Sequence, residues 1–90
     1  MFETLEQLMK IIRKRKNSSS DKSYTNKLLS DKSLSVAKVK EEIVELIEAV
    51  EQNSNKIHEA ADVIYHLMVY LEANNIKIED VMSELKKRQK

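Results

Sequence analysis

The sequence predicts an all-α fold, and three observations support this prediction. The chain has 90 residues and contains no Gly and no Pro, where average usage predicts about ten of the two together. Tight β-hairpins depend on Gly and Asn-Gly turns, so an all-β fold is disfavoured. Apolar residues recur at three- and four-residue steps, which is the spacing of amphipathic helices. Short stretches rich in Asn, Ser and Asp separate these patterns and indicate loops.

The expected elements follow one another with short connections. The expected helices cover residues 2–16, 23–29, 34–52 and 56–74, and a last helix begins at 79–80. The expected loops are 17–21, 30–33 and 53–55. Ser23 suits the N-cap position of the second helix, and Asn74-Asn75 can close the fourth because Asn tolerates the left-handed conformation. The short connection at 53–55 predicts that the helices on either side of it are antiparallel.

Length and composition limit the possible classes of function. We treat residues 1–90 as a single domain, and a chain this short is marginally stable alone. The absence of Cys excludes disulfides and thiolate metal sites. A net charge of +1 and few aromatic residues disfavour a nucleic-acid partner. We expect no membrane span and no secretory signal, and hence a cytoplasmic protein.

The two central helices each carry an apolar face that we expect to be buried. On the helix at 34–52 it consists of Val36, Val39, Ile43, Leu46, Ile47 and Val50. On the helix at 56–74 it consists of Ile57, Ala60, Ala61, Ile64, Leu67, Met68 and Leu71. An antiparallel pair buries one face of each helix, so a symmetric dimer that joins two pairs into a four-helix bundle would complete the core.

Four acids at helical spacing form a candidate metal site. Glu42 and Glu45 lie on adjacent turns of one helix, and Glu59 and Asp62 lie on adjacent turns of the next. An antiparallel pair can aim all four carboxylates at one point, and oxygen ligands suit Mg²⁺, which it shares with substrate phosphates. The helix at 34–52 also repeats like charges on successive turns, at a cost of roughly 0.2–0.5 kcal/mol per pair. The alternative is a solvated acidic face, and spacing alone does not decide between the two.

Other polar residues have a structural and a functional interpretation. On the helix at 23–29, Thr25 and Lys27 can donate to a phosphate, or Lys27 is solvated while Tyr24 anchors the segment to the core. His58 and His66 are interpreted as satisfied polar neighbours rather than ligands. The basic residues near 13–16 and 86–90 are interpreted as solvated helix ends.

Four longer motifs resemble those of one known family. They are SYTNKL at 23–28, VKEEIVEL at 39–46, EAADVIYHL at 59–67 and EDV followed by EL at 79–85. These stretches resemble S-[YW]-T-x-K-L, V-G-E-E-x-x-E-L, E-x-A-D-x-x-Y-H-L and E-D-V-x-x-E-L of the phosphoribosyl-ATP pyrophosphohydrolase family, within the MazG-like all-α nucleotide pyrophosphatase superfamily. The E-x-x-E and E-x-x-D pairs alone indicate the superfamily. The first and third motifs indicate this member of it, and the resemblance covers nearly the whole chain.

The resemblance implies a reaction and a set of site residues. The implied reaction is Mg²⁺-dependent hydrolysis of phosphoribosyl-ATP to phosphoribosyl-AMP and pyrophosphate, the second step of histidine biosynthesis, by a homodimer. The implied ligands of Mg²⁺ are Glu42, Glu45, Glu59 and Asp62. Glu41 or Glu45 would take the proton from the attacking water. The implied phosphate-binding residues are Thr25 and Lys27.

Two departures from the family pattern and two alternative functions accompany this interpretation. Lys40 stands where the family usually has Gly, and Lys77 stands where Ser often caps the last helix, which predicts a frayed start. One alternative is a house-cleaning pyrophosphatase that acts on ordinary or damaged nucleoside triphosphates. The other is a helical adaptor without catalytic activity, whose acids serve solubility.

Overall fold

The computed structural model describes residues 1–17 and 23–89, and helices make up most of this part of the chain. In order, they are α1 (Glu3–Lys16), α2 (Tyr24–Ser30), α3 (Lys32–Gln52), α4 (Lys56–Ala73) and α5 (Ile78–Arg88). The described residues contain no strand, so the predicted all-α class is confirmed. Apart from Asn17, the loop predicted at 17–21 lies outside the described residues, as does Lys90 of the predicted basic tail.

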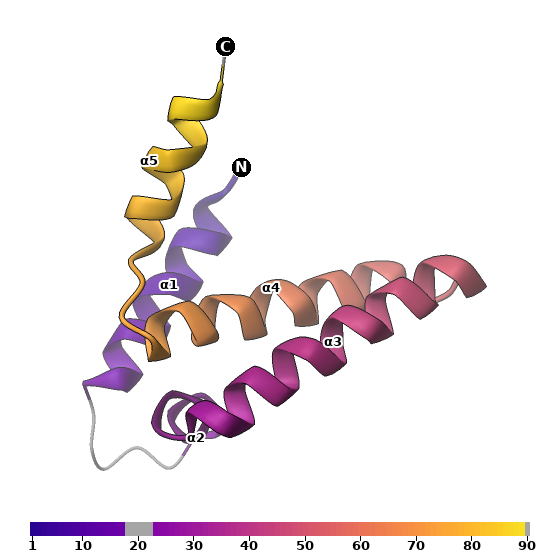
Figure 1. Cartoon of the computed structure of the whole chain (residues 1–90), viewed down its shortest axis with the longest axis horizontal. Coiled ribbons are helices and arrows are strands. Elements are labelled where there is room, and N and C mark those ends of the chain that lie inside the picture. The colour runs from indigo at the N-terminus through magenta and orange to yellow at the C-terminus, as the bar shows by residue number, and fades with distance from the viewer. Residues whose placement is uncertain (18–22, 90) are drawn as a thin grey trace.

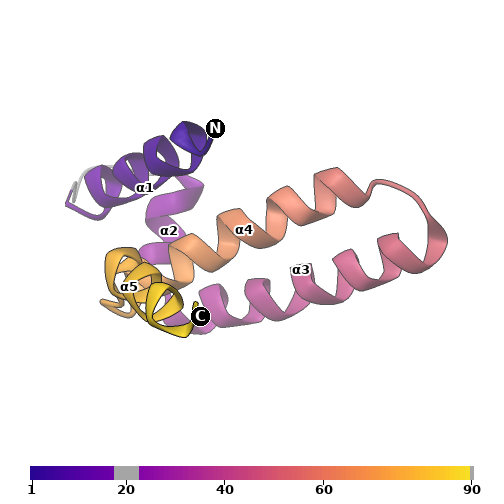
Figure 2. The same cartoon turned by 90° about the horizontal axis from the view of Figure 1, so that it is seen from above.

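The two long helices, α3 and α4, form an arm that extends from the rest of the molecule. They run side by side in opposite directions and meet at a tight turn at the far end of the arm (Figures 1 and 2). The remaining helices, α1, α2 and α5, gather at the other end of the arm (Figures 1 and 2). The predicted antiparallel pair with short flanking helices is therefore confirmed. Within residues 1–17 and 23–89, no helix combines the length and apolarity that a membrane crossing requires.

Asparagine supplies the left-handed backbone that this Gly-free chain needs at its turns. Asn53 and Asn55 have φ of 53° and 52° on either side of the turn between α3 and α4, and Asn75 has φ of 59° after α4. Asn visits this region more readily than most residues because its short polar side chain can bond locally. The predicted closure of α4 at Asn74-Asn75 is confirmed, with Asn74 as the C-cap.

The helix ends confirm one predicted cap and contradict one predicted loop. Ser23 caps α2, as predicted, by accepting a hydrogen bond from the backbone N–H of Asn26 at 3.1 Å. The loop predicted at 30–33 is wrong, because α2 ends at Ser30 and α3 begins at Lys32. Asp31 makes this abrupt change possible, since its Oδ1 accepts from the N–H of Leu34 at 3.0 Å and so caps α3.

A small apolar core and an ion-pair cluster join the flanking helices to the base of the arm. Ile12, Leu28, Met68 and Val69 form the buried cluster, contributed by α1, α2 and α4. Beside it, the Arg13 guanidinium of α1 donates to both carboxylate oxygens of Glu79 at the start of α5. These contacts fix the end of the arm that lies away from the turn.

The expectation that the apolar face of α3 is buried within the pair is wrong for this chain on its own. The buried residues of α3 are Ser35, Glu42 and Ala49, spaced seven apart. In contrast, Ile47 is 52% exposed and Val50 is 58% exposed. Small and acidic side chains therefore occupy the buried side of α3, which leaves much of its apolar face uncovered.

Candidate metal centre

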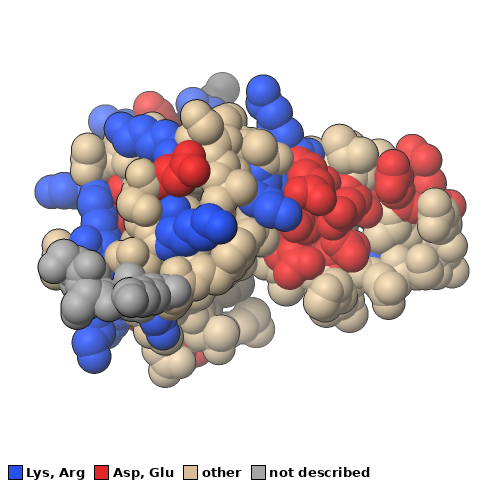
Figure 3. Space-filling model, turned by 90° about the horizontal axis from the view of Figure 1, so that it is seen from below, with Lys and Arg blue, Asp and Glu red and all other residues tan. Residues whose placement is uncertain are grey.

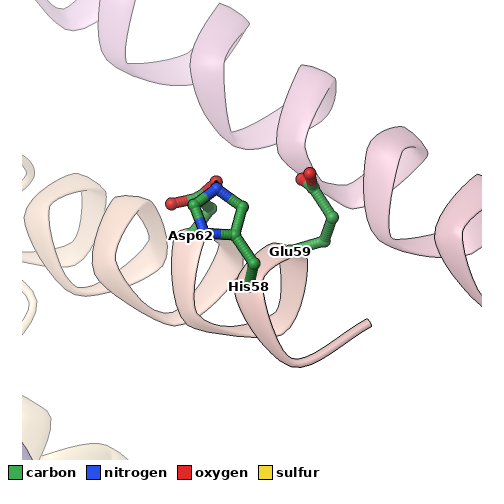
Figure 4. Close-up of side chains that lie close together, drawn as sticks. All are labelled: His58, Glu59 and Asp62. Atoms are coloured by element: carbon green, nitrogen blue, oxygen red, sulfur yellow. The ribbon is translucent and has the colours of Figure 1, made fainter. Parts of the chain in front are cut away.

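Carboxylates from the two helices of the arm meet midway along it. One oxygen from each of Glu42, Glu45 and Glu59 lies within 4.8 Å of the other two. Glu42 and Glu45 come from adjacent turns of α3, and Glu59 extends from the first turn of α4 toward α3 (Figure 4). The antiparallel packing thus brings together acids that are 14 to 17 positions apart in the sequence.

Asp62, the fourth predicted ligand, belongs to a neighbouring group that shares Glu59. In this second group, ligand atoms of His58, Glu59 and Asp62 lie within 4.8 Å of one another. The Asp62 charge is also close enough to Glu42 to raise the pKa of that carboxyl. The structure therefore brings the four predicted ligands together around Glu59.

Two oxygens in this cluster are buried without a hydrogen-bond partner among the described residues. Glu42 is 8% exposed, and neither its Oε2 nor the Oε2 of Glu59 has a hydrogen-bond partner among the described residues. A buried charged oxygen without a partner is costly. A divalent cation would satisfy both oxygens, and a set of carboxylate donors matches the preference of Mg²⁺. The residues present therefore fit a hard cation.

The surroundings of the cluster disfavour full ionisation of its carboxyl groups. Desolvation raises the pKa of Glu42, and contacts with Glu45 and the charge of Asp62 raise it further. Desolvation also raises the pKa of Glu59, with Glu45 and Asp62 adding to the effect. Two carboxylates can bond to each other only when one of them is protonated. The metal-free cluster therefore favours retention of a proton, and a bound cation would favour its loss.

An aromatic network connects α2 to the part of α4 that carries Asp62. His66 is buried, and its Nδ1 lies 2.9 Å from the backbone oxygen of Asp62, while its Nε2 lies 3.1 Å from the hydroxyl of Tyr24. In the neutral ring, Nδ1 donates to the carbonyl and Nε2 accepts from Tyr24. Tyr65 stacks on Tyr24 with ring centroids 6.5 Å apart. This network places α2 along the border of the carboxylate cluster.

The predicted phosphate-binding residues of α2 occupy different environments. Thr25 is buried, and its hydroxyl bonds to that of Tyr65. Lys27 is exposed. The expected involvement of both residues with phosphate stays a prediction.

Glu41 and Tyr24 lie at the rim of the carboxylate cluster. Glu41, a predicted base, lies outside the two groups of ligand atoms and pairs with Lys38 at 3.1 Å. Tyr24 approaches the cluster closely enough for Lys38 and Glu42 to affect the pKa of its hydroxyl, which burial raises. The S-Y-T motif includes Tyr24 and so could have indicated a role for it. Its position beside α4, however, depends on tertiary packing.

Charge is distributed unevenly over the surface. Acidic side chains gather over the α3–α4 arm, while Lys and Arg gather mainly over the body that the other helices form (Figure 3). The net charge of +1 conceals this separation. The cluster therefore lies on an acidic arm, where a cation is attracted before any substrate binds.

The fold and the site define an all-α protein in which two antiparallel helices hold a carboxylate cluster suited to a divalent cation. A model of one family, phosphoribosyl-ATP pyrophosphohydrolase, matches residues 5–89. This chain belongs to the phosphoribosyl-ATP pyrophosphohydrolase family, as the four sequence motifs predict.

Several relatives align over almost the whole chain. A phosphoribosyl-ATP pyrophosphatase of Clostridium novyi is 42% identical, with 99% of this chain and 84% of the relative covered. Another, from Clostridium acetobutylicum, is 44% identical, with coverages of 96% and 81%. A chloroplastic histidine biosynthesis bifunctional protein of Arabidopsis thaliana is 42% identical over 94% of this chain. The chain spans only 33% of that plant protein, so it corresponds to one part of it.

Proposed function

We propose that this protein hydrolyses phosphoribosyl-ATP to phosphoribosyl-AMP and pyrophosphate with the help of Mg²⁺, as a step of histidine biosynthesis. Membership of the family and the names of the clostridial relatives support the reaction. The observation that carries the proposal is the buried, unpartnered oxygen of Glu42 within a carboxylate cluster. A solvated acidic face would not bury such an oxygen.

In this proposal, Glu42, Glu45, Glu59 and Asp62 hold Mg²⁺ between α3 and α4. When bound, Mg²⁺ supplies neutralising charge to phosphate oxygens and lowers the pKa of a coordinated water. The chain itself mainly positions the reacting groups, since phosphoryl transfer depends largely on alignment and charge neutralisation. Because α3 and α4 pack along their length, the carboxylates are arranged on rigid elements.

Glu41 is the residue that we favour as the general base. Glu45 lies inside the group of ligand atoms, whereas Glu41 lies outside it on the same helix. A carboxylate that binds no metal is free to accept a proton from the attacking water. Lys38, paired with Glu41 at 3.1 Å, would hold this carboxylate in place until substrate arrives. Glu45 is the alternative base.

The α2 residues would serve the phosphate end of the substrate. α2 borders the cluster through the contact between Tyr24 and His66. We propose that Lys27 supplies positive charge to the phosphates. Thr25 would approach them through its hydroxyl, whose bond to Tyr65 holds it in the wall of the site.

The decisive experiment measures pyrophosphate release from phosphoribosyl-ATP with and without Mg²⁺. We expect activity only with Mg²⁺, and we expect Glu42→Gln and Asp62→Asn to reduce it by more than the roughly 10- to 100-fold typical of losing a partner of a metal ligand. Glu48→Gln is the matched control, because Glu48 is an exposed acid of α3 outside the cluster. Full activity of either cluster variant would refute the site.

The same assay distinguishes the alternatives. A house-cleaning enzyme would turn over ATP or dUTP as well as phosphoribosyl-ATP. A chain that releases no pyrophosphate from any of these nucleotides with Mg²⁺ would instead be an adaptor.

We also propose that two copies associate through the arm. Ile43, Ile47 and Val50 repeat along one face of α3 and are 43–58% exposed, while Ile57 and Ile64 of α4 are 88% and 48% exposed. Apolar residues repeated along a helix and left uncovered mark an association surface. A symmetric dimer would join two arms into a four-helix bundle.

A further inference from the structure

Tyr24 places an exposed aromatic residue at the border of the carboxylate cluster. It is the first residue of α2, which packs against both α3 and α4 at the base of the arm (Figures 1 and 2). Tyr24 is 47% exposed. Among residues 1–17 and 23–89, the other strongly exposed aromatic residue is Phe2, at the start of α1. Tyr24 is therefore the aromatic residue that a ligand of the cluster can reach from solvent.

The orientation of Tyr24 is the reverse of the usual one. A tyrosine ordinarily buries its ring and leaves its hydroxyl in contact with water. Here the hydroxyl lies 3.1 Å from Nε2 of His66, which is only 7% exposed. Burial also raises the pKa of this hydroxyl. The polar end of the side chain therefore points into the protein, and the exposed part of the residue includes its ring.

The neighbours of Tyr24 hold its ring in one position. Tyr65 lies nearly parallel to Tyr24, at an interplanar angle of 16°, and its own hydroxyl bonds to buried Thr25. The ring of His66 meets Tyr24 edge-on, at an angle of 76°. Each of the two tyrosines is thus anchored through its hydroxyl. A ring that is already ordered loses little conformational freedom when a ligand packs against it.

The same network connects Tyr24 to a proposed metal ligand. Nδ1 of His66 lies 2.9 Å from the backbone oxygen of Asp62, so one imidazole separates the Tyr24 hydroxyl from this residue. In a nucleotide, one ribose separates the α-phosphate from the base. Residues 43–58, which lead toward the turn of the arm, contain no Phe, Trp or Tyr. A nucleotide whose phosphates lie at the cluster therefore finds an aromatic partner for its base on the α2 side.

We propose that the ring of Tyr24 stacks on the base of the bound nucleotide. Stacking of a base on an aromatic side chain is worth roughly 5- to 150-fold in affinity. Tyr24 would thus favour a nucleotide over a polyphosphate that has no base. This inference rests on the proposed function, because it takes phosphoribosyl-ATP as the substrate. The hydroxyl of Tyr24 then anchors α2, and its ring binds substrate.

A fluorescence experiment tests this stacking directly. The chain contains no Trp, so Tyr24→Trp introduces a single indole, and Trp keeps an N–H that can donate to His66. The full chain of this variant is titrated in Mg²⁺ with phosphoribosyl-AMP, which contains the base, and with ribose 5-phosphate, which does not. We expect phosphoribosyl-AMP to quench the indole and ribose 5-phosphate to leave it unchanged. Phe2→Trp is the matched control, because Phe2 is 70% exposed but precedes α1, and it should respond to neither compound.

Kinetics separate the ring of Tyr24 from its hydroxyl. Tyr24→Leu removes the ring, so we expect the KM for phosphoribosyl-ATP to rise roughly 5- to 150-fold while kcat changes little. Tyr24→Phe keeps the ring and removes only the hydroxyl, so its KM should stay closer to that of wild type. Circular dichroism should show wild-type helicity for both variants. If Tyr24→Leu does not fold, the indole titration and Tyr24→Phe still test the stacking.

The outcomes distinguish this inference from the proposed function. An indole at position 24 that does not respond to phosphoribosyl-AMP would overturn the stacking, as would equal rises in KM for Tyr24→Leu and Tyr24→Phe. A fall in kcat at unchanged KM in Tyr24→Leu would also overturn it and assign Tyr24 a structural role. In each of these cases, Mg²⁺-dependent pyrophosphate release by wild type would still support the proposed function. If wild type releases no pyrophosphate, selective quenching by phosphoribosyl-AMP would support the stacking while the proposed reaction fails.

Discussion

At the scale of single residues, Glu42 shows how a binding site opposes stability. Its carboxyl is buried, and desolvation raises its pKa above the usual 4.5. A carboxyl with a raised pKa destabilises the fold at every pH above that pKa, and the penalty disappears as pH falls below the ordinary value. The metal-free protein is therefore less stable at neutral pH than its packing alone would allow.

We expect Glu42→Gln to stabilise the metal-free protein while abolishing activity. The amide removes the buried charge and can donate to the neighbouring carboxylate of Glu45, a bond to a charged group worth about 1.5–3 kcal/mol. Each kcal/mol corresponds to about 4–8 °C in Tm for a domain of this size. Thermal melts in EDTA at pH 7 measure the gain. The gain should shrink at acidic pH, where Glu42 is protonated, and a lower Tm at pH 7 would contradict the expectation.

At the scale of elements, the junction of α2 and α3 depends on one side chain. Asp31 separates the two helices and caps α3 through the N–H of Leu34. We expect Asp31→Ala to destabilise the protein by about 0.5–2 kcal/mol, because the cap bond is lost. Denaturant unfolding measures the change. Ser33→Ala, at an exposed position in the first turn of α3, is the control, and an equal effect of both variants would argue against the cap.

The elements also show how far the sequence predicts this structure. Periodicity and Asn-rich breaks placed the long helices well, because both signals are local. The helix cap formed by Asp31 was missed, since the Ser-Asp-Lys-Ser stretch has the composition of a loop. Only the hydrogen bond of Asp31 distinguishes a helix cap from a loop. The spacing of the acids predicted their convergence. It did not predict that Glu42 would be buried rather than Ile47, because that choice depends on how α3 rotates against α4.

At the scale of the whole molecule, an ion pair joins the two ends of the chain. The Arg13 guanidinium of α1 lowers the pKa of Glu79 at the start of α5 to about 2. A lowered pKa contributes stability that is present above about 4.5 and is lost as pH falls toward 2. We therefore expect wild type to lose more stability than Glu79→Gln between pH 5 and pH 2.5. Circular dichroism measures the loss of stability in both proteins. An equal loss in the two would show that the ion pair contributes nothing.

The uncovered apolar face of the arm leads to a prediction about the oligomeric state of the molecule in solution. Burying an Ile side chain contributes about 1.5–3 kcal/mol to the free energy of association. In a symmetric interface, each residue makes this contribution twice, once from each copy. We expect wild type to be a dimer by light scattering, with a Tm that rises with protein concentration. Ile47→Asp and Ile64→Asp should yield monomers, because each places a charge in the interface on both copies.

The control for this prediction is Ile11→Asp, since Ile11 is similarly exposed, at 49%, but lies on α1 outside the arm. It should leave the dimer intact if association uses α3 and α4. A wild-type monomer at all concentrations would reject the interface. Dissociation by Ile11→Asp alone would move the interface to the body of the molecule. Because α3 carries Glu42 on its buried side and Ile47 on its exposed side, dissociation should also loosen the cluster and reduce Mg²⁺ affinity.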